Sequence, residues 1–213
     1  MGLYNKYILP KFINCACGSK PINYQRSKIV PYAKGVVLDI GIGSGLNIPF
    51  YNKSNINHLY GLDPSSELIE IAKRVAKIHE LEMEFVECCA ESIPLADNSI
   101  DTIVITYTMC TIPDISLSNA EMFRVLKPNG KLLFCEHGIA PDERVAKWQK
   151  IINPVWSKIA GGCNLNRDIP RLIESSGLKI SEIEEMYLPS TPKFAGTIIG
   201  ELLKNKIYRR DNV

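Results

Sequence analysis

The stretch Val37-Leu38-Asp39-Ile40-Gly41-Ile42-Gly43-Ser44-Gly45 decides the fold of this 213-residue chain. A short apolar run that leads directly into spaced glycines is typical of a β-strand that is buried on both faces and ends in a tight loop beside a ligand. Four more short apolar runs lie between turn signals, and each predicts a buried strand. The five expected strands cover residues 36–40, 58–62, 83–88, 102–106 and 131–136.

Helical patterns alternate with these strands. Residues 64–79 carry an apolar stripe at helical spacing, with Pro64 in the expected first turn and Asp63 as the expected cap. Residues 118–126 form a second expected helix, and the sequence Lys127-Pro128-Asn129-Gly130 after it predicts a turn.

The alternation stops after residue 136. Two late strand-like stretches, 178–187 and 194–202, predict an antiparallel strand pair at the C-terminus. Together with the alternating units before them, they predict an α/β fold with a doubly wound, mostly parallel sheet.

The net charge of +2 hides an uneven distribution. Residues 1–34 carry six basic residues and no acid, and residues 202–213 carry four basic residues and one acid. The part between them holds 15 basic and 22 acidic residues. With 46% hydrophobic residues, the length suits one domain of ordinary size. The chain is therefore an acidic body with basic ends.

Composition and pattern exclude several classes of protein. No apolar run approaches the roughly 20 residues that span a bilayer. Pro10, Lys11 and Asn14 interrupt the only apolar candidate for a signal peptide, so we expect a reducing, cytoplasmic location. The seven cysteines form no paired CxxC motif and the three histidines are scattered, so we expect no metal site.

The spacing of the glycine loop indicates the class of ligand. The loop reads D-x-G-x-G-x-G over Asp39, Gly41, Gly43 and Gly45, whereas a dinucleotide loop reads G-x-G-x-x-G. An acid two positions before the loop suits a ligand with a cationic end. Asp63, at the end of the second strand, suits the hydroxyls of a ribose, and its simpler alternative role is that of a helix cap.

Four motifs stand in order across residues 36–136: VLDIGIGSG, GLDPS, AESIPLADNSIDTIV and RVLKPNGKLL. As a set they resemble the class I S-adenosylmethionine-dependent methyltransferases. The flanking motif INCACGSK, the segment 148–156 and the motif GCNLNR resemble the methyltransferase-like 7 group, which includes animal thiol S-methyltransferases and many bacterial proteins. The resemblance implies a Rossmann-like fold and S-adenosyl-L-methionine as the cofactor.

The resemblance also implies roles for individual residues. The three glycines of the loop would line the methionine part of the cofactor, and Asp39 would orient that loop. Asp63 would hold the ribose hydroxyls, and Leu62 or Pro64 would pack on the adenine.

Further cofactor contacts are implied after the third and fourth strands. The backbone N–H of Ala90 would pair with the adenine edge. Cys89 stands where many relatives carry an aspartate, and Glu91 is the alternative side chain for that contact. Thr106 and Tyr107 would lie near the methyl sulfonium.

Direct in-line methyl transfer requires a base only when the acceptor is protonated at neutral pH, as a thiol is. His137, just past the fifth strand, is the candidate base, with Tyr107 as a second candidate catalytic residue. Two other candidates for a catalytic role have simpler interpretations: we interpret Asp114 as a helix cap and Cys110 as a core residue.

Aromatic residues suggest where the acceptor binds. They occur before the first strand and after the fifth, and they would form an apolar pocket or simply cover the sheet. These residues are Tyr4, Tyr7, Phe12, Tyr24, Tyr32, Trp148 and Trp156.

The sequence therefore predicts an S-adenosylmethionine-dependent methyltransferase acting on a small, apolar acceptor: a thiol, a quinone-type ring or a lipid. The alternative is a sensor or scaffold that binds the cofactor without turnover. A nucleic-acid substrate is not expected, because the stretch Thr106-Tyr107-Thr108-Met109 lacks the motifs of those enzymes.

The basic N-terminal segment has two interpretations. We expect residues 1–34 to form a lid on the substrate side and residues 35–213 to form the cofactor-binding domain. The alternation of basic residues with Tyr and Ile in the lid segment also suits peripheral contact with an anionic membrane. The number of subunits is not indicated by the sequence.

Overall fold

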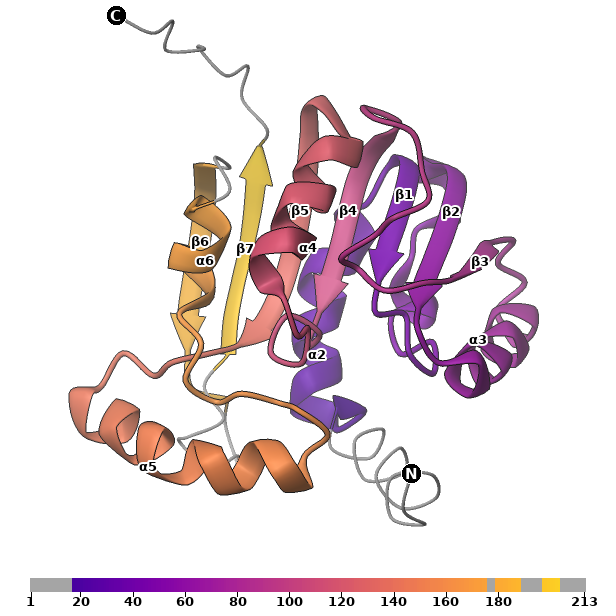
Figure 1. Ribbon diagram of the computed structural model, residues 1–213. Coiled ribbons are helices and arrows are strands. Elements are labelled where there is room, and N and C mark those ends of the chain that lie inside the picture. The colour runs from indigo at the N-terminus through magenta and orange to yellow at the C-terminus, as the bar shows by residue number, and fades with distance from the viewer. Residues whose placement is uncertain (1–16, 176–178, 189–196, 204–213) are drawn as a thin grey trace, which may run out of the picture.

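The computed structural model describes residues 17–175, 179–188 and 197–203, and they form one seven-stranded sheet covered by helices (Figure 1). The strands are β1 (Gly35–Ile40), β2 (Ile56–Asp63), β3 (Glu84–Glu87), β4 (Ile100–Thr106), β5 (Leu126–His137), β6 (Lys179–Met186) and β7 (Thr197–Leu203). Their order is β3-β2-β1-β4-β5-β7-β6. The first five strands are parallel to their neighbours, and β7 is antiparallel to both β5 and β6. The predicted fold class and the antiparallel C-terminal pair are both confirmed.

Apolar side chains on the two faces of the sheet form two separate cores. Leu38 and Ile40 of β1 belong to one core and Val37, just before them, belongs to the other, because successive side chains of a strand point to opposite faces. The helices that cover the faces are α2 (Lys20–Ile29), α3 (Ser66–Ile78), α4 (Ile115–Val125) and α6 (Ile169–Glu174). α4 and α6 contribute to the first core, and α2 and α3 to the second.

The remaining helix, α5 (Glu143–Ile159), lies beyond the edge at which β1, β2 and β4 end (Figure 1). In a parallel sheet this carboxyl edge is where ligands bind. α5 and the loop after it therefore form the far wall of any site at that edge.

Two local predictions were wrong. Asp63 does not cap the helix that follows β2: Ser65 is the cap of α3, and its Oγ accepts a hydrogen bond from the backbone N–H of Leu68 at 3.3 Å. Residues 127–130, expected to form a turn, lie within β5 instead. They form an irregularity in the pairing of β5 with β4, because Ile100 pairs with Leu126 and Thr102 already pairs with Lys131. The prediction for Asp114 is confirmed, since its Oδ1 accepts from the N–H of Leu117 at 3.0 Å.

The N-terminal segment is described from residue 17 onward, and the expected rings at 4, 7 and 12 lie outside the described residues. α2 packs against β5 and β7, so this part of the segment covers the sheet. Tyr24, Tyr32 and Trp148 are 63%, 67% and 62% exposed, so they do not form an enclosed apolar wall. The expected division at residue 34 stays a prediction. Among the described helices, none has the length and apolarity that a membrane span requires.

Candidate functional site

The glycine loop after β1 is built from three residues with positive φ: Gly41 at +71°, Gly43 at +53° and Gly45 at +86°. A Cβ on Gly41 would overlap the side chain of Thr108, and one on Gly45 would lie 2.7 Å from Ile48. A Cβ on Gly43 would meet nothing closer than a backbone oxygen at 3.8 Å. The first and third glycines therefore allow close packing, whereas the middle one leaves the loop open to an approaching ligand.

Asp63, at the end of β2, holds this loop directly. One carboxylate oxygen accepts from the N–H of Gly43 at 3.0 Å, and the other accepts from the N–H of Ser65 at 2.9 Å. The residue is 7% exposed, and burial raises the pKa of its carboxyl group while the two backbone donors oppose the shift. Because a carboxylate has about four acceptor positions, Asp63 can still accept from two hydroxyls of a ligand.

Asp39 lies behind the loop and is fully buried. The side-chain amide of Asn47 donates to both of its oxygens at 3.0 Å, and the hydroxyl of Tyr51 donates to one at 2.8 Å. Burial raises the pKa of Asp39 to about 7, although both hydrogen bonds oppose this shift. Asp39 therefore cannot touch a ligand itself. It fixes the chain that follows the glycine loop, which agrees with the orienting role that the sequence predicted.

A buried arginine joins this network from α2. Arg26 is 3% exposed, and its Nε donates to Oδ1 of Asn47 at 3.0 Å. Its Nη1 donates to the carbonyl of Cys17 at 2.7 Å, and its guanidinium lies 4.9 Å from the ring centre of Tyr107. The hydroxyl of Thr106 donates to the same Asn47 oxygen at 3.0 Å. Thr106 thus belongs to the support of the site.

Sequence reasoning missed Arg26, Asn47 and Tyr51. A signal existed, because a charged residue in the middle of a buried strand requires donors nearby. Asp39 offers four acceptor positions, and Asn47 and Tyr51 are polar residues that follow it a short distance further along the chain. Arg26 gave no comparable signal, since it is one of six basic residues in an apparently uniform segment.

The end of β4 is held in a strained conformation by Glu136. Tyr107 has a φ of +53°, which costs a non-glycine residue about 1–3 kcal/mol. Oε1 of Glu136 accepts from the N–H groups of Thr108 and Met109 at 2.8 and 3.1 Å. Burial raises the pKa of Glu136 to about 7, and its Oε2 has no hydrogen-bond partner among the described residues. The strain lies where the sequence predicted the reacting methyl group.

His137, the predicted base, meets two cysteines. Its Nε2 lies 3.2 Å from Sγ of Cys163, and the indole N–H of Trp156 donates to the same sulfur at 3.3 Å. Hydrogen bonds from Cys110, His137 and Trp156 together lower the pKa of Cys163 well below its usual range, although burial opposes them. Burial alone would lower the pKa of His137, but its contact with Cys163 gives a net rise. Cys110 is buried as predicted, but it is not an isolated core residue.

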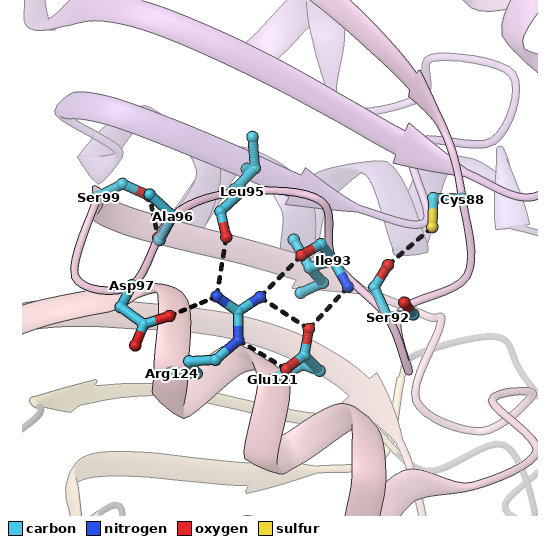
Figure 2. Close-up of polar contacts among 9 residues, drawn as sticks. All are labelled: Cys88, Ser92, Ile93, Leu95, Ala96, Asp97, Ser99, Glu121 and Arg124. Carbon is cyan, nitrogen blue, oxygen red and sulfur yellow. Dashed lines mark hydrogen bonds and ion pairs between the residues drawn. The ribbon is translucent and has the colours of Figure 1, made fainter.

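The loop after β3, expected at the adenine, is fixed by Arg124 of α4 (Figure 2). The guanidinium donates to the carbonyls of Ile93 and Leu95 and forms ion pairs with Asp97 and Glu121 at 2.7 Å. Glu121 accepts in turn from the N–H of Ile93 at 2.8 Å. The third and fourth sequence motifs are therefore one structural unit.

The expected adenine contacts differ in their accessibility. Cys89 is exposed, whereas Ala90 is 6% exposed, and Oε1 of Glu91 accepts from the N–H of Asp114 at 3.2 Å. Leu62 is 1% exposed and belongs to the core, while Pro64 is exposed. Of the two residues predicted to pack on the adenine, Pro64 is the accessible one.

The donor set suits the predicted cofactor. The opening at Gly43 admits a ligand to the backbone of the loop, and Asp63 beside it retains acceptor positions for hydroxyls. Both features lie at the carboxyl ends of β1 and β2, where open α/β sheets bind their ligands.

The chain is similar to several known methyltransferases. The family described as "Methyltransferase domain" matches residues 38–134. Thiol S-methyltransferase TMT1B of Rattus norvegicus is 31% identical over 81% of this chain and 70% of its own length. The ubiquinone/menaquinone biosynthesis C-methyltransferase UbiE of Geotalea daltonii is 33% identical over 51% of this chain and 48% of its own.

Among solved structures, the YcgJ protein of Bacillus subtilis superposes with a TM-score of 0.68 at 19% identity, covering 88% of this chain and 99% of that one. That likeness shows the fold, and the sequence match to the rat enzyme shows the family. The chain belongs to the class I methyltransferases that use S-adenosylmethionine as cofactor, the family that includes the thiol S-methyltransferases.

Proposed function

We propose that the chain methylates a small, apolar acceptor and that the acceptor is a thiol. The observation that carries this proposal is the group of Cys110, His137 and Cys163, which lies at the carboxyl ends of β4 and β5, and β4 is the sheet neighbour of β1, the strand that leads into the glycine loop. Thiol S-methyltransferases match 81% of the chain, beyond the 97-residue cofactor region that the domain family covers. The match therefore includes parts of the chain outside the cofactor site.

When bound, the cofactor supplies a methyl group that is already activated on a sulfonium. The chain must therefore mainly position the acceptor and admit no competing nucleophile. We assign the ribose to Asp63 and the methionine end to the backbone at Gly43. His137 and Tyr107 are the two side chains that we assign to contact with the acceptor.

A ring carbon of a quinone precursor is the second candidate acceptor. The relative UbiE supports it, but that match covers only 51% of this chain, against 81% for the thiol enzyme. The alternative from a different functional class is a sensor that binds the cofactor without catalysing methyl transfer.

One experiment separates these candidates. The full chain is incubated with methyl-labelled S-adenosylmethionine and a panel of aliphatic thiols, aromatic thiols, quinols and lipid amines. We expect label in a thiol and none with Asp63→Ala. Label in a quinol alone would overturn the thiol assignment. Calorimetric binding of the cofactor without label in any acceptor, including a cell lysate, would favour the sensor.

We also propose peripheral contact with an anionic membrane, supported by α5. Its apolar exposed residues recur at intervals of three and four, which places them on one face of the helix. These residues are Trp148 (62% exposed), Ile151 (67%), Val155 (65%) and Ile159 (50%). Exposed lysines lie beside them at 147, 150 and 158. A basic helix with an apolar face that includes Trp suits the interface of an anionic bilayer.

A further inference from the structure

Two cysteines and a histidine from three separate segments meet at the acceptor side of the site. Cys110 follows β4, His137 ends β5, and Cys163 stands in the loop after α5. Their Sγ and Nε2 or Nδ1 atoms all lie within 4.8 Å of one another. The six cysteines of the described residues form no disulfide, so both sulfurs are available.

We propose that these three side chains bind a zinc ion. Two thiolates and one imidazole form a ligand set that zinc prefers, and oxygen-seeking cations such as Mg²⁺ and Ca²⁺ do not use it. A tetrahedral zinc with bonds of about 2.0–2.3 Å places its ligand atoms about 3.5–3.8 Å apart. The 3.2 Å between His137 and Cys163 and the 4.8 Å limit for the set bracket this spacing. Small rotations of the side chains therefore suffice to form the site.

Hydrogen bonds hold the loop that carries Cys163 against the segment that carries Cys110, independently of any metal. The backbone N–H and the side-chain amide of Asn164 both donate to the carbonyl of Cys110, at 2.9 and 3.1 Å. Asn153 of α5 donates to Oδ1 of Asn164 at 3.1 Å and accepts from the N–H of Leu165 at 2.7 Å. The loop that carries Cys163 is thus fixed to the segment that carries Cys110.

Trp156 completes this support. Its indole N–H donates to the sulfur of Cys163, which is the kind of outer contact that orients a metal-bound thiolate. The pattern explains why sequence spacing alone predicted no metal site. The ligands are 27 and 26 positions apart along the chain, and only the fold brings them together.

Three protein ligands leave one position of a tetrahedral zinc open, as in catalytic zinc sites. Cys163 is partly exposed, so the trio is not sealed from solvent on the side of this residue. The acceptor thiol binds there, and this step rests on the proposed function. Its S–H bond breaks, the proton leaves to solvent, and a sulfur lone pair forms the zinc–sulfur bond.

The metal would hold the acceptor as a thiolate beside the cofactor loop. Gly41 of that loop packs against Thr108, two residues before Cys110. His137 then serves the reaction as a metal ligand and not as a base.

The test measures metal binding alone, with the full chain reduced under anaerobic conditions and without cofactor or acceptor. We expect one zinc per chain by mass spectrometry of the metal. We also expect cobalt to give thiolate charge-transfer bands and the visible bands of a tetrahedral site. Cys163→Ser and His137→Asn should each weaken zinc binding at least about 100-fold, measured by competition with a chromophoric chelator. Trp156→Phe should weaken it about 10-fold.

Matched controls keep the result interpretable. Cys88→Ser removes a thiol that donates to the carbonyl of Ser92 and is not a member of the trio, and the variant should bind zinc as the wild type does. Far-ultraviolet circular dichroism and calorimetry with S-adenosylmethionine establish that each variant is folded. A folded wild type that binds neither metal, or zinc affinity that His137→Asn and Cys163→Ser leave unchanged, would overturn the site. The metal site would also be overturned if Cys110 and Cys163, once reduced, formed a disulfide again in reducing buffer.

A second measurement tests the open position. Adding a small thiol to the cobalt-loaded chain should shift the charge-transfer bands, whereas the corresponding thioether should not. Unchanged bands would overturn the role in acceptor binding while leaving the metal site intact. If S-adenosylmethionine does not bind in calorimetry, the proposed function fails, and the zinc stoichiometry still decides the metal site.

Discussion

The cofactor side and the acceptor side of the site are built differently, although they lie along one edge of the sheet. The cofactor side is built from short motifs at the ends of β1 and β2, which contain Asp39, Gly43 and Asp63, and backbone N–H groups make several of its bonds. The acceptor side joins residues that are far apart, since Asn164 binds the carbonyl of Cys110 across 54 positions. Local motifs therefore mark the cofactor side in the sequence, whereas the acceptor side is assembled only in the tertiary structure.

The largest expected effect of a substitution on the cofactor side is a loss of cofactor binding at Asp63. Asp63→Ala removes the charge-assisted hydrogen bond that fixes Gly43 of the glycine loop, a second one to Ser65, and the acceptor positions for the ribose, so S-adenosylmethionine should bind about 100-fold more weakly. Titration calorimetry measures the dissociation constant. Glu70→Ala, an exposed acid on α3, is the matched control and should leave it unchanged. An equal loss in both variants would contradict the local role of Asp63.

Arg26 connects the two sides, so its removal tests whether they are separate. Arg26→Met leaves Oδ1 of Asn47 and the carbonyl of Cys17 with fewer donors, and the free energy of unfolding should fall by about 2–4 kcal/mol. Urea unfolding followed by circular dichroism measures this. Lys28→Met on the same helix, whose charge lies 3.8 Å from Glu184, should cost less than about 0.5 kcal/mol. A stable Arg26→Met protein would show that the buried network is not needed for folding.

The buried acid of the cofactor side gives a pH dependence. Because the pKa of Asp39 is raised from 3.8 to about 7, the folded chain binds its proton more tightly than the unfolded chain does. The stabilisation is complete below about pH 4 and is lost as the pH rises through 7, a change of a few kcal/mol. Asp39→Asn should flatten part of this decline in the unfolding free energy, and Glu136 and Asp63, whose pKa values are also raised by burial, contribute to what remains. An unchanged slope in the variant would contradict a protonated Asp39 at acidic pH.

The smallest effect is expected on the outer surface of the acceptor side. Replacing Ile151 and Val155 together by serine should reduce sedimentation with phosphatidylserine vesicles several-fold, because these side chains would enter the bilayer interface. Binding of S-adenosylmethionine should not change. Ile78→Ser removes an equally exposed residue, 77% accessible, from α3 and should not affect sedimentation. If the wild type, the double variant and Ile78→Ser all sediment to the same extent, α5 is not part of the proposed membrane contact.

The sequence predicted the strands and the glycine loop because each depends on residues within a few positions of one another. It misplaced the cap of α3, since Asp63 is held by Gly43 across 20 positions and Ser65 is left to begin the helix. It missed Arg26 for a similar reason, because burial of one basic residue among six depends on packing between α2 and the sheet. The cysteines of the acceptor side looked unrelated because chain spacing does not report spatial distance.

The hydrogen bond from Arg26 to Asn47 also limits how the chain can be dissected. A fragment that begins at residue 35 would start neatly at the first strand, yet the side-chain oxygen of Asn47 would lose one of its two donors. The apolar surface that Ile29 and Val30 cover would become solvent-exposed. Such a fragment would retain every motif of the family and still be a poor folding unit, so the N-terminal helix has to be retained in any expressed version of the domain.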